Sequence, residues 1–147
     1  MAVPSLTNSN ILLIEDTPSY QDLMLIAFEE NNFPYELHIV SDGEAALQFL
    51  HKEKSYSTAP RPDLILLDLN LPKMSGHDLL KIIKQEANLK TIPIIVLTSS
   101  TEQTDILKSY HLRANCYLTK PYSLQEFINL VKVSLNFWLN CSQLSKT

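Results

Sequence analysis

Leu64-Ile65-Leu66-Leu67-Asp68-Leu69-Asn70-Leu71-Pro72 is the stretch of this 147-residue chain from which the fold is predicted. Its first four residues are apolar and follow Pro62, which predicts a short strand that is buried on both faces. Such continuous apolar runs are typical of parallel sheets covered by helices. The run ends on Asp68, and ligands of open parallel sheets sit at the carboxyl ends of the strands. This stretch alone does not separate a functional carboxylate from an aspartate that caps the turn after the strand.

The composition limits the class of protein. A chain of 147 residues predicts one domain that buries a real core. The formal net charge of −4 argues against a surface built for nucleic acid. Residues 1–10 lack the basic and apolar regions of a signal peptide, and no apolar run approaches the roughly 18 residues of a membrane helix. Cys116 and Cys141 lack metal-site spacing and fit a reducing compartment. We therefore expect a cytoplasmic protein that binds neither nucleic acid nor a membrane.

Short apolar runs alternate with segments of helical spacing along the chain. The predicted strands lie at residues 11–14, 37–40, 64–67, 94–97 and 116–118. The predicted helices start near Pro18, after Asp42 and after Gly76, and then span residues 102–110 and about 124–139. This order predicts an α/β fold, a flavodoxin-like doubly wound (βα)5 three-layer sandwich with a parallel five-stranded sheet of order 2-1-3-4-5. The chain has only two glycines and no glycine-rich phosphate loop, which argues against nucleotide or flavin binding.

Four of the five predicted strands end on reactive or polar groups. These groups are Glu15 and Asp16 after the first strand, Asp68 after the third, Thr98 after the fourth and Lys120 after the fifth. Because the strands of a parallel sheet point the same way, we expect these side chains to converge at one rim. Such a set at matching strand ends favours a functional site over five unrelated capping residues.

The three acids of this rim predict a metal site. Crowded carboxylates repel one another and raise one another's pKa unless a cation compensates them. Mg²⁺ takes one or two carboxylates together with waters and phosphate oxygens, and a backbone carbonyl near Asn70 could complete the coordination. A carboxylate such as Asp68 can also act as a nucleophile and form an aspartyl phosphate. Lys120 would then neutralise the phosphoryl charge, and Thr98 would offer it a hydroxyl.

These residues resemble the receiver domain of two-component response regulators. The match consists of Glu15-Asp16, Asp68, Pro72, Gly76, Thr98 and Lys120-Pro121, and it spans about residues 10–139. The resemblance implies that Asp68 accepts a phosphoryl group from a sensor histidine kinase. It implies that Asp16 and Asp68 hold Mg²⁺ while Glu15 assists through water. It also implies that Lys120 pairs with the phosphoryl group, that Thr98 moves toward it, and that the Lys120–Pro121 bond is cis. Tyr117 occupies the aromatic switch position of the family.

A closer resemblance is visible outside the site. Four segments look like the single-domain regulators of bacterial phytochromes, especially cyanobacterial ones: Pro60-Arg61-Pro62, Leu69-Asn70-Leu71-Pro72-Lys73, Asn115-Cys116-Tyr117-Leu118-Thr119-Lys120 and Phe137-Trp138-Leu139. The implied partner is a phytochrome histidine kinase. One departure is Arg113, where receivers commonly have glycine after the fourth helix, and a left-handed non-glycine residue costs on the order of 1 kcal/mol.

The last residues of the sequence bear on how the protein would pass a signal to a partner. Only eight residues follow the last predicted helix, so we expect residues 1–147 to form a single receiver domain without an effector domain. The last helix carries a second apolar stripe of Leu130, Val133 and Phe137, with Trp138 beside it. A surface helix of a small domain needs only one such stripe, so the second is a partner surface or part of a broad core face. We expect a homodimer through the fourth helix, the fifth strand and the fifth helix.

Two other functions remain open at this level. An aspartate-nucleophile phosphatase of the haloacid-dehalogenase type needs a second aspartate two residues after the nucleophile, but Asn70 stands there and cannot act as an acid or base. A binding module that has lost phosphorylation would not need the intact set of acids. The sequence therefore favours a phosphorylation switch rather than an enzyme.

Overall fold

The structure, a computed structural model, describes residues 9–145, and residues 1–8 and 146–147 lie outside the described residues. The strands are β1 (Asn10–Ile14), β2 (Glu36–Val40), β3 (Leu64–Leu67), β4 (Ile94–Thr98) and β5 (Cys116–Thr119). The helices are α1 (Pro18–Glu30), α2 (Gly43–His51), α3 (Gly76–Gln85), α4 (Gln103–His111) and α5 (Leu124–Asn136). A 3-10 turn, Lys54–Tyr56, follows α2, and a π-helical turn, Phe137–Cys141, follows α5.

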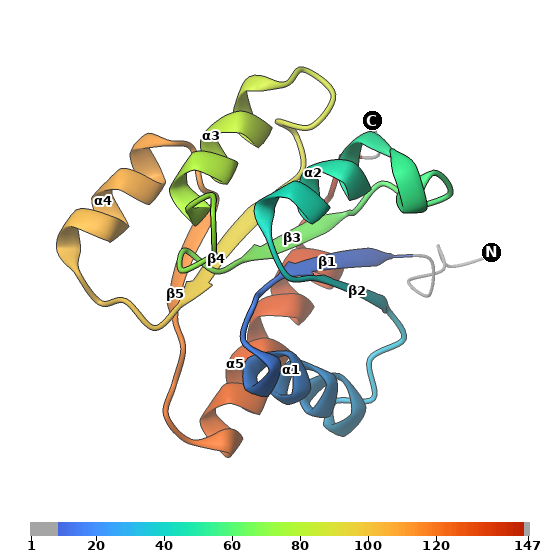
Figure 1. Cartoon of the computed structure of the whole chain (residues 1–147). Coiled ribbons are helices and arrows are strands. Elements are labelled where there is room, and N and C mark those ends of the chain that lie inside the picture. Colours follow the sequence, from blue (N-terminus) through green and yellow to red (C-terminus); the bar gives the residue numbers. More distant parts are fainter. Residues whose placement is uncertain (1–8, 146–147) are drawn as a thin grey trace.

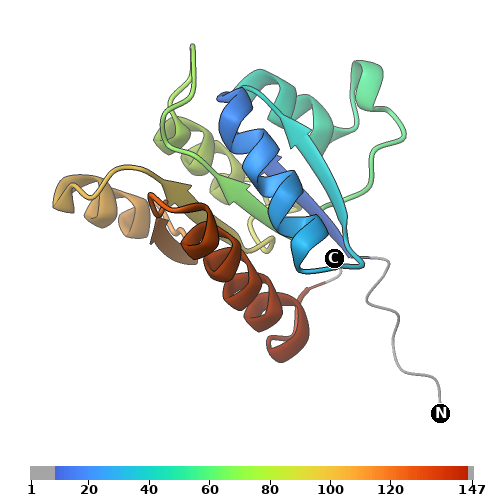
Figure 2. The ribbon, with the colours of Figure 1, turned by 90° about the horizontal axis from the view of Figure 1, so that it is seen from below.

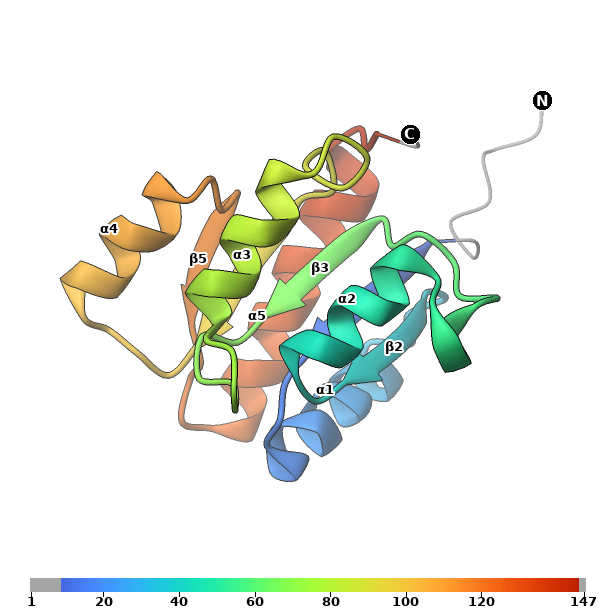
Figure 3. The same cartoon turned by 45° about the horizontal axis from the view of Figure 1, so that its top comes forward.

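The strands form one parallel sheet in the order β2-β1-β3-β4-β5, which confirms the predicted topology. Figure 1 shows this sheet between two layers of helices, with α1 and α5 on one face and α2, α3 and α4 on the other. Seen from below in Figure 2, α1 and α5 lie side by side. In Figure 3, α2 and α3 lie in front of the sheet. The molecule is thus the flavodoxin-like three-layer sandwich that the sequence predicts.

The apolar run of β3 is continuous because both faces of the strand are covered. Leu64 and Leu66 belong to the core cluster on the side of α1 and α5, while Ile65 and Leu67 belong to the cluster on the side of α2 and α3. None of the four is more than 3% exposed. Side chains alternate between the two faces of a strand, so a strand buried on both sides must be apolar at every position.

Three helices, α2, α3 and α5, begin at polar side-chain caps. The Asp42 carboxylate accepts a hydrogen bond from the Ala45 backbone N–H at 2.7 Å and so caps α2, which starts after Asp42 as predicted. Ser75 and Ser123 cap α3 and α5 in the same way. Each cap satisfies a backbone donor that would otherwise lack an intrahelical acceptor. The caps therefore fix where each of these three helices starts relative to the end of the strand before it.

The last predicted helix, residues 124–139, is shorter in the structure. The α-helix ends at Asn136, and the chain continues as a wider π-helical turn in which the Ser142 N–H donates to the Phe137 carbonyl at 2.8 Å. This turn buries Leu139 against the core on the α1 and α5 side. Within residues 9–145 no helix is both long enough and apolar enough to cross a bilayer.

Two backbone features flank β5. Arg113, where receivers commonly have glycine after α4, adopts a φ of 78°, which lies in the left-handed region. The expected cis bond between Lys120 and Pro121 is wrong, because the described residues contain no cis peptide bond. The trans isomer is the lower-energy form of a bond before proline.

Candidate functional site

Three carboxylates meet at the carboxyl ends of two neighbouring strands. Glu15 and Asp16 follow β1, Asp68 follows β3, and the two strands pair so that Ile14 lies opposite Leu67. One oxygen from each carboxylate lies within 4.8 Å of the others. Glu15 and Asp68 are buried, whereas Asp16 is half-buried. The sequence prediction that these acids converge is confirmed, and hard oxygen ligands at this spacing suit a small divalent cation.

Lys120 enters this cluster from the end of β5. Its Nζ donates to Glu15 Oε1 at 2.5 Å and to Asp68 Oδ2 at 3.3 Å. Its backbone N–H donates to the Thr98 carbonyl at 2.8 Å, which ties the start of the β5–α5 loop to β4. The ammonium is nearly inaccessible, with 3% of the side chain exposed. One buried cation therefore serves two buried anions and leaves the cluster with surplus negative charge.

The pKa of Glu15 reflects its burial and the charges around it. Burial raises the pKa of Glu15 from 4.5 to about 7, and the nearby Asp68 adds to the rise, while the hydrogen bond and the charge of Lys120 oppose it. Desolvation disfavours a charged carboxylate, and a neighbouring anion does the same. A divalent cation among the three acids would supply the missing positive charge, so the residues present fit a metal site.

Thr98 ends β4 with a buried hydroxyl. The residue is fully buried, and among the described residues its Oγ1 is the one buried side-chain polar atom that lacks a hydrogen-bond partner. A buried polar group without a partner costs about 1–3 kcal/mol. Since β4 pairs with β3 beside Asp68, the hydroxyl is available to a ligand that binds at this rim.

The loop after β3 folds tightly against the backbone of Asp68. The Gly76 N–H donates to the Leu69 carbonyl at 2.9 Å, and the Asn70 N–H donates to Asp68 Oδ1 at 3.2 Å. A Cβ atom on Gly76 would lie 2.5 Å from the Asp68 carbonyl oxygen and 2.5 Å from Leu69 Cα. Only glycine fits this approach, which explains its place in the motif. The predicted contribution of the Asn70 carbonyl to metal binding stays a prediction.

Tyr117 connects β5 to the loop after Thr98. Its hydroxyl donates to the Ser100 carbonyl at 2.9 Å, and its backbone N–H donates to the Tyr110 hydroxyl of α4 at 3.1 Å. Burial raises the pKa of the Tyr117 phenol, which favours the neutral, donating form. The predicted switch residue is therefore in contact with the loop that follows Thr98, and its role in switching stays a prediction.

The sequence analysis does not identify Tyr20, which contacts the site. Lys120 Nζ lies 3.7 Å from the centroid of the Tyr20 ring. Gln21, the next residue, donates from Nε2 to the Glu15 carbonyl at 2.6 Å. The available signal was the short distance along the chain, because a helix that begins at Pro18 must place its first turn beside Glu15.

The predicted dimer residues of the last helix are exposed to different degrees. Val133 and Phe137 are 67% and 55% exposed, but Leu130 and Trp138 pack partly against the core. The second stripe is therefore narrower than the sequence suggests. The homodimer itself stays a prediction.

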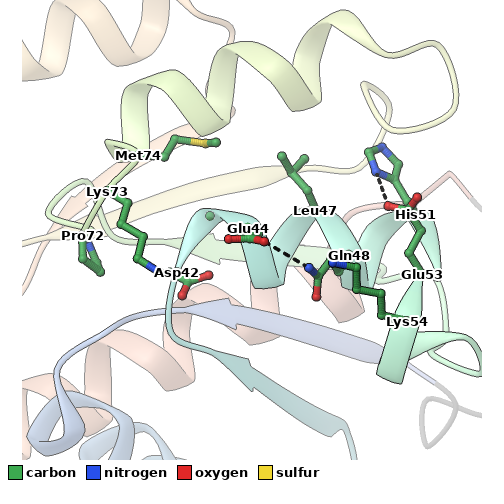
Figure 4. Close-up of a pocket in the computed structure, with 11 residues that line it drawn as sticks. Asp42, Glu44, Leu47, Gln48, His51, Glu53, Lys54, Pro72, Lys73 and Met74 are labelled. Atoms are coloured by element: carbon green, nitrogen blue, oxygen red, sulfur yellow. Dashed lines mark hydrogen bonds and ion pairs between the residues drawn. The ribbon is translucent and has the colours of Figure 1, made fainter.

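A cavity of about 600 Å³ lies beside the rim, between α2 and the loop after β3 (Figure 4). Leu47, Met74 and Pro72 form apolar parts of its wall, and Figure 4 shows side chains of both charges around them. None of the three clustered acids lines this cavity. It is separate from the acidic cluster.

Comparison with known proteins agrees with this geometry. The response regulator receiver domain family matches residues 11–132. The chain is 44% identical over 129 residues to the response regulator Rcp1 of Synechocystis sp., an alignment that covers 88% of each protein. The phosphorylated cyanobacterial phytochrome response regulator RcpA has a similar structure, with a TM-score of 0.90 and 41% identity over 95% of this chain and 99% of RcpA. The Mn²⁺-bound form of Rcp1 gives a TM-score of 0.86 and 42% identity over 93% of this chain and 99% of Rcp1. The chain belongs to the family of response regulator receiver domains.

Proposed function

We propose that the protein is a response regulator that accepts a phosphoryl group on Asp68 from a sensor histidine kinase and signals through protein–protein contact. The observation that carries the proposal is the position of Asp68, whose buried carboxylate lies between two further acids and the ammonium of Lys120. The protein is thus a signalling protein, and the reaction at this site phosphorylates the protein itself. Residues 1–147 would act as one receiver domain.

The chemistry of transfer follows from the side chains at the rim. An Asp68 carboxylate oxygen forms a bond to phosphorus as the P–N bond of a phosphohistidine breaks, and the imidazole keeps the electron pair of that bond. Lys120 balances part of the negative charge that arrives with the phosphoryl group. The Thr98 hydroxyl, which is buried without a partner, gains an acceptor in a phosphoryl oxygen.

The metal we propose for this site is Mg²⁺, held by Asp16, Asp68 and the backbone carbonyl of Asn70, with Glu15 assisting through water. When bound, Mg²⁺ supplies positive charge that screens the attacking carboxylate from the phosphoryl oxygens. The support in this chain is the separation of roles among the acids. Glu15 is buried and occupied by Lys120 and by the Thr17 N–H, whereas Asp16 is partly open to solvent.

The partner we propose is a phytochrome histidine kinase, because the similar protein RcpA is a cyanobacterial phytochrome response regulator. The similar protein Rcp1 is also a response regulator. We further propose a cytoplasmic homodimer that contacts neither nucleic acid nor membrane. The support is the net charge of −4 and the exposed side chains of Val133 on α5 and Phe137 just after it, with Leu107 and Tyr110 exposed on α4.

Acetyl phosphate with Mg²⁺, followed by intact mass measurement, tests the proposed phosphorylation. We expect one phosphoryl adduct on the wild type and none on Asp68→Asn, with circular dichroism showing that the variant is folded. Turnover of acetyl phosphate without an adduct would instead indicate a phosphatase. No reaction at all would indicate a binding module, and an undiminished adduct on Asp68→Asn would refute the assignment of the acceptor.

A further inference from the structure

The Tyr20 ring is the third partner of the Lys120 ammonium. Nζ lies 2.5 Å from Glu15 Oε1, 3.3 Å from Asp68 Oδ2 and 3.7 Å from the centroid of the Tyr20 ring. An ammonium has three N–H donors and no acceptor. Two carboxylates and one aromatic face therefore match the donors of this nearly buried cation.

The ring is itself held in place from two sides. Gln21 fastens the first turn of α1 to the segment after β1 through its hydrogen bond to the Glu15 carbonyl at 2.6 Å. On the other side, the centroid of the Tyr20 ring lies 6.3 Å from the centroid of the Phe127 ring on α5. Phe127 is 1% exposed. The ring also lines a cavity of about 320 Å³ with Pro121 and Leu124. Tyr20 thus stands between Lys120 and a solvent-accessible cavity.

We propose that Tyr20 is a positioning residue for phosphoryl transfer, and that its ring face keeps the Lys120 ammonium beside Asp68 when the carboxylates are engaged by a metal ion. The inference rests on the proposed transfer to Asp68.

The physical reason is that the carboxylates and the ring respond differently to added positive charge. A cation shared among Glu15, Asp16 and Asp68 competes with Lys120 for the same oxygens and repels the ammonium. The attraction of an ammonium to the aromatic quadrupole does not use those oxygens. The ring is therefore the partner that Lys120 retains when the charge of the acids is balanced.

Two variants of one residue separate the ring from the hydroxyl and from the space that it fills. Tyr20→Phe keeps the aromatic face, whereas Tyr20→Leu keeps an apolar side chain without a ring. The probe is acetyl phosphate at saturating Mg²⁺, a small donor that needs no docking surface, and the rate of adduct formation is followed by intact mass. We expect Tyr20→Phe to react at nearly the wild-type rate and Tyr20→Leu to react about five- to thirtyfold more slowly.

A double-mutant cycle tests whether Tyr20 acts through Lys120. In a Lys120→Met background we expect Tyr20→Leu to leave the residual rate nearly unchanged, because the cation that the ring holds is gone. An equal slowing in both backgrounds would show that the ring only supports the fold and would overturn the proposal. A Tyr20→Phe variant as slow as Tyr20→Leu would overturn it as well.

A second readout does not depend on reaction. The ring current of Tyr20 should shift the Lys120 ε-methylene proton resonances upfield in the metal-free protein, and this shift should persist when Mg²⁺ is added. Tyr20→Phe should keep the shift and Tyr20→Leu should lose it. Loss of the shift in the wild type on adding Mg²⁺ would mean that the ring releases the ammonium, which contradicts the proposal.

If Tyr20→Leu does not fold, phenylalanine analogues with increasing numbers of ring fluorines can be placed at position 20. They keep the shape of the ring and weaken its quadrupole, so the phosphorylation rate should fall with each added fluorine. A constant rate across the series would overturn the proposal. Failure of the proposed function is distinguishable, since it would appear as an adduct on Asp68→Asn or as no adduct on the wild type.

Discussion

Lys120 Nζ lies closer to Glu15 than to Asp68, at 2.5 Å from Glu15 Oε1. The ammonium of Lys120, after β5, therefore interacts mainly with the carboxylate of Glu15, after β1. Even so, the pKa of Glu15 is raised to about 7, because burial outweighs the contribution of Lys120. The energetics of the metal-free site depend on how this one carboxyl is protonated.

Stability of the metal-free protein should fall as the pH rises from 5 to 8. The pKa of Glu15 is higher in the folded state than the unperturbed 4.5, so the folded state binds its proton more tightly. The resulting stabilisation is fully present below pH 4.5 and is lost as the pH rises through about 7. Urea denaturation in a chelating buffer measures this fall. Glu15→Gln should flatten it, whereas Glu29→Gln, at an exposed position of α1, should not.

Asp16→Asn should weaken Mg²⁺ binding more than Glu15→Gln does. Asp16 is the partly open acid of the cluster, while Glu15 already accepts a hydrogen bond from Lys120. Removing a charge that contacts the ion removes about 1–4 kcal/mol of attraction, so we expect a loss of about tenfold or more for Asp16→Asn. Calorimetric titration with Mg²⁺ ranks the two variants, and equal or reversed effects would contradict the proposed division of roles.

Lys120→Ala should leave Mg²⁺ affinity unchanged or higher, because a cation next to the acids is removed. The same change should impair the response to phosphorylation, since the phosphoryl charge loses its partner. Mg²⁺ titration and the oligomeric state with and without acetyl phosphate measure the two effects. A variant that still responds like the wild type would rule out this role for Lys120.

Gly76→Ala should destabilise the protein and disturb the loop after Asp68. The added Cβ would lie 2.5 Å from two backbone atoms, which cannot move without displacing the loop, and such overpacking costs about 1–3 kcal/mol. Gly43→Ala is the matched control, because its Cβ would meet the flexible end of Met74 at 2.9 Å. Urea midpoints compare the two variants, and a smaller loss for Gly76→Ala than for Gly43→Ala would be unexpected.

The double variant Val133→Glu, Phe137→Glu should weaken the proposed homodimer. These two side chains, one on α5 and one at the start of the turn after it, are the exposed members of the second stripe. Trp138 packs partly against the core, so its substitution would affect folding instead. Sedimentation at tens of micromolar measures the assembly, with Leu25→Glu on the exposed face of α1 as the control. A monomeric wild type, with and without phosphoryl donor, would end the dimer hypothesis.

The strands could be predicted from the sequence because continuous apolar runs mark them. The acidic rim could be predicted because all strands of a parallel sheet point the same way. A strand such as β3, apolar at every position, has to be buried on both faces, and parallel strand ends have to meet at one rim. The short distance along the chain from Glu15 to Tyr20 places this residue near the site, but the contact of its ring with Lys120 could not be predicted in this way. It depends on the rotamers of two side chains that are distant in sequence, and spacing does not report those.

The end of α5 shows the same limit. Apolar spacing continues to residue 139, but the wider turn from Phe137 to Cys141 is set by how Leu139 fits against the core. The narrow stripe of Val133 and Phe137 is a result of this packing. Helical periodicity marks apolar faces, but it does not say which residue of a face a neighbouring element already covers.

The hydrogen bond from the Tyr117 N–H to the Tyr110 hydroxyl has a consequence for solubility. β5 lies at an edge of the sheet, and the backbone donors of an edge strand can pair with a strand from another molecule. The Tyr110 phenol occupies one of these donors at 3.1 Å. The Tyr110 side chain of α4 thereby makes this edge of the sheet less able to pair with a strand of another molecule, which is the pairing that leads to aggregation.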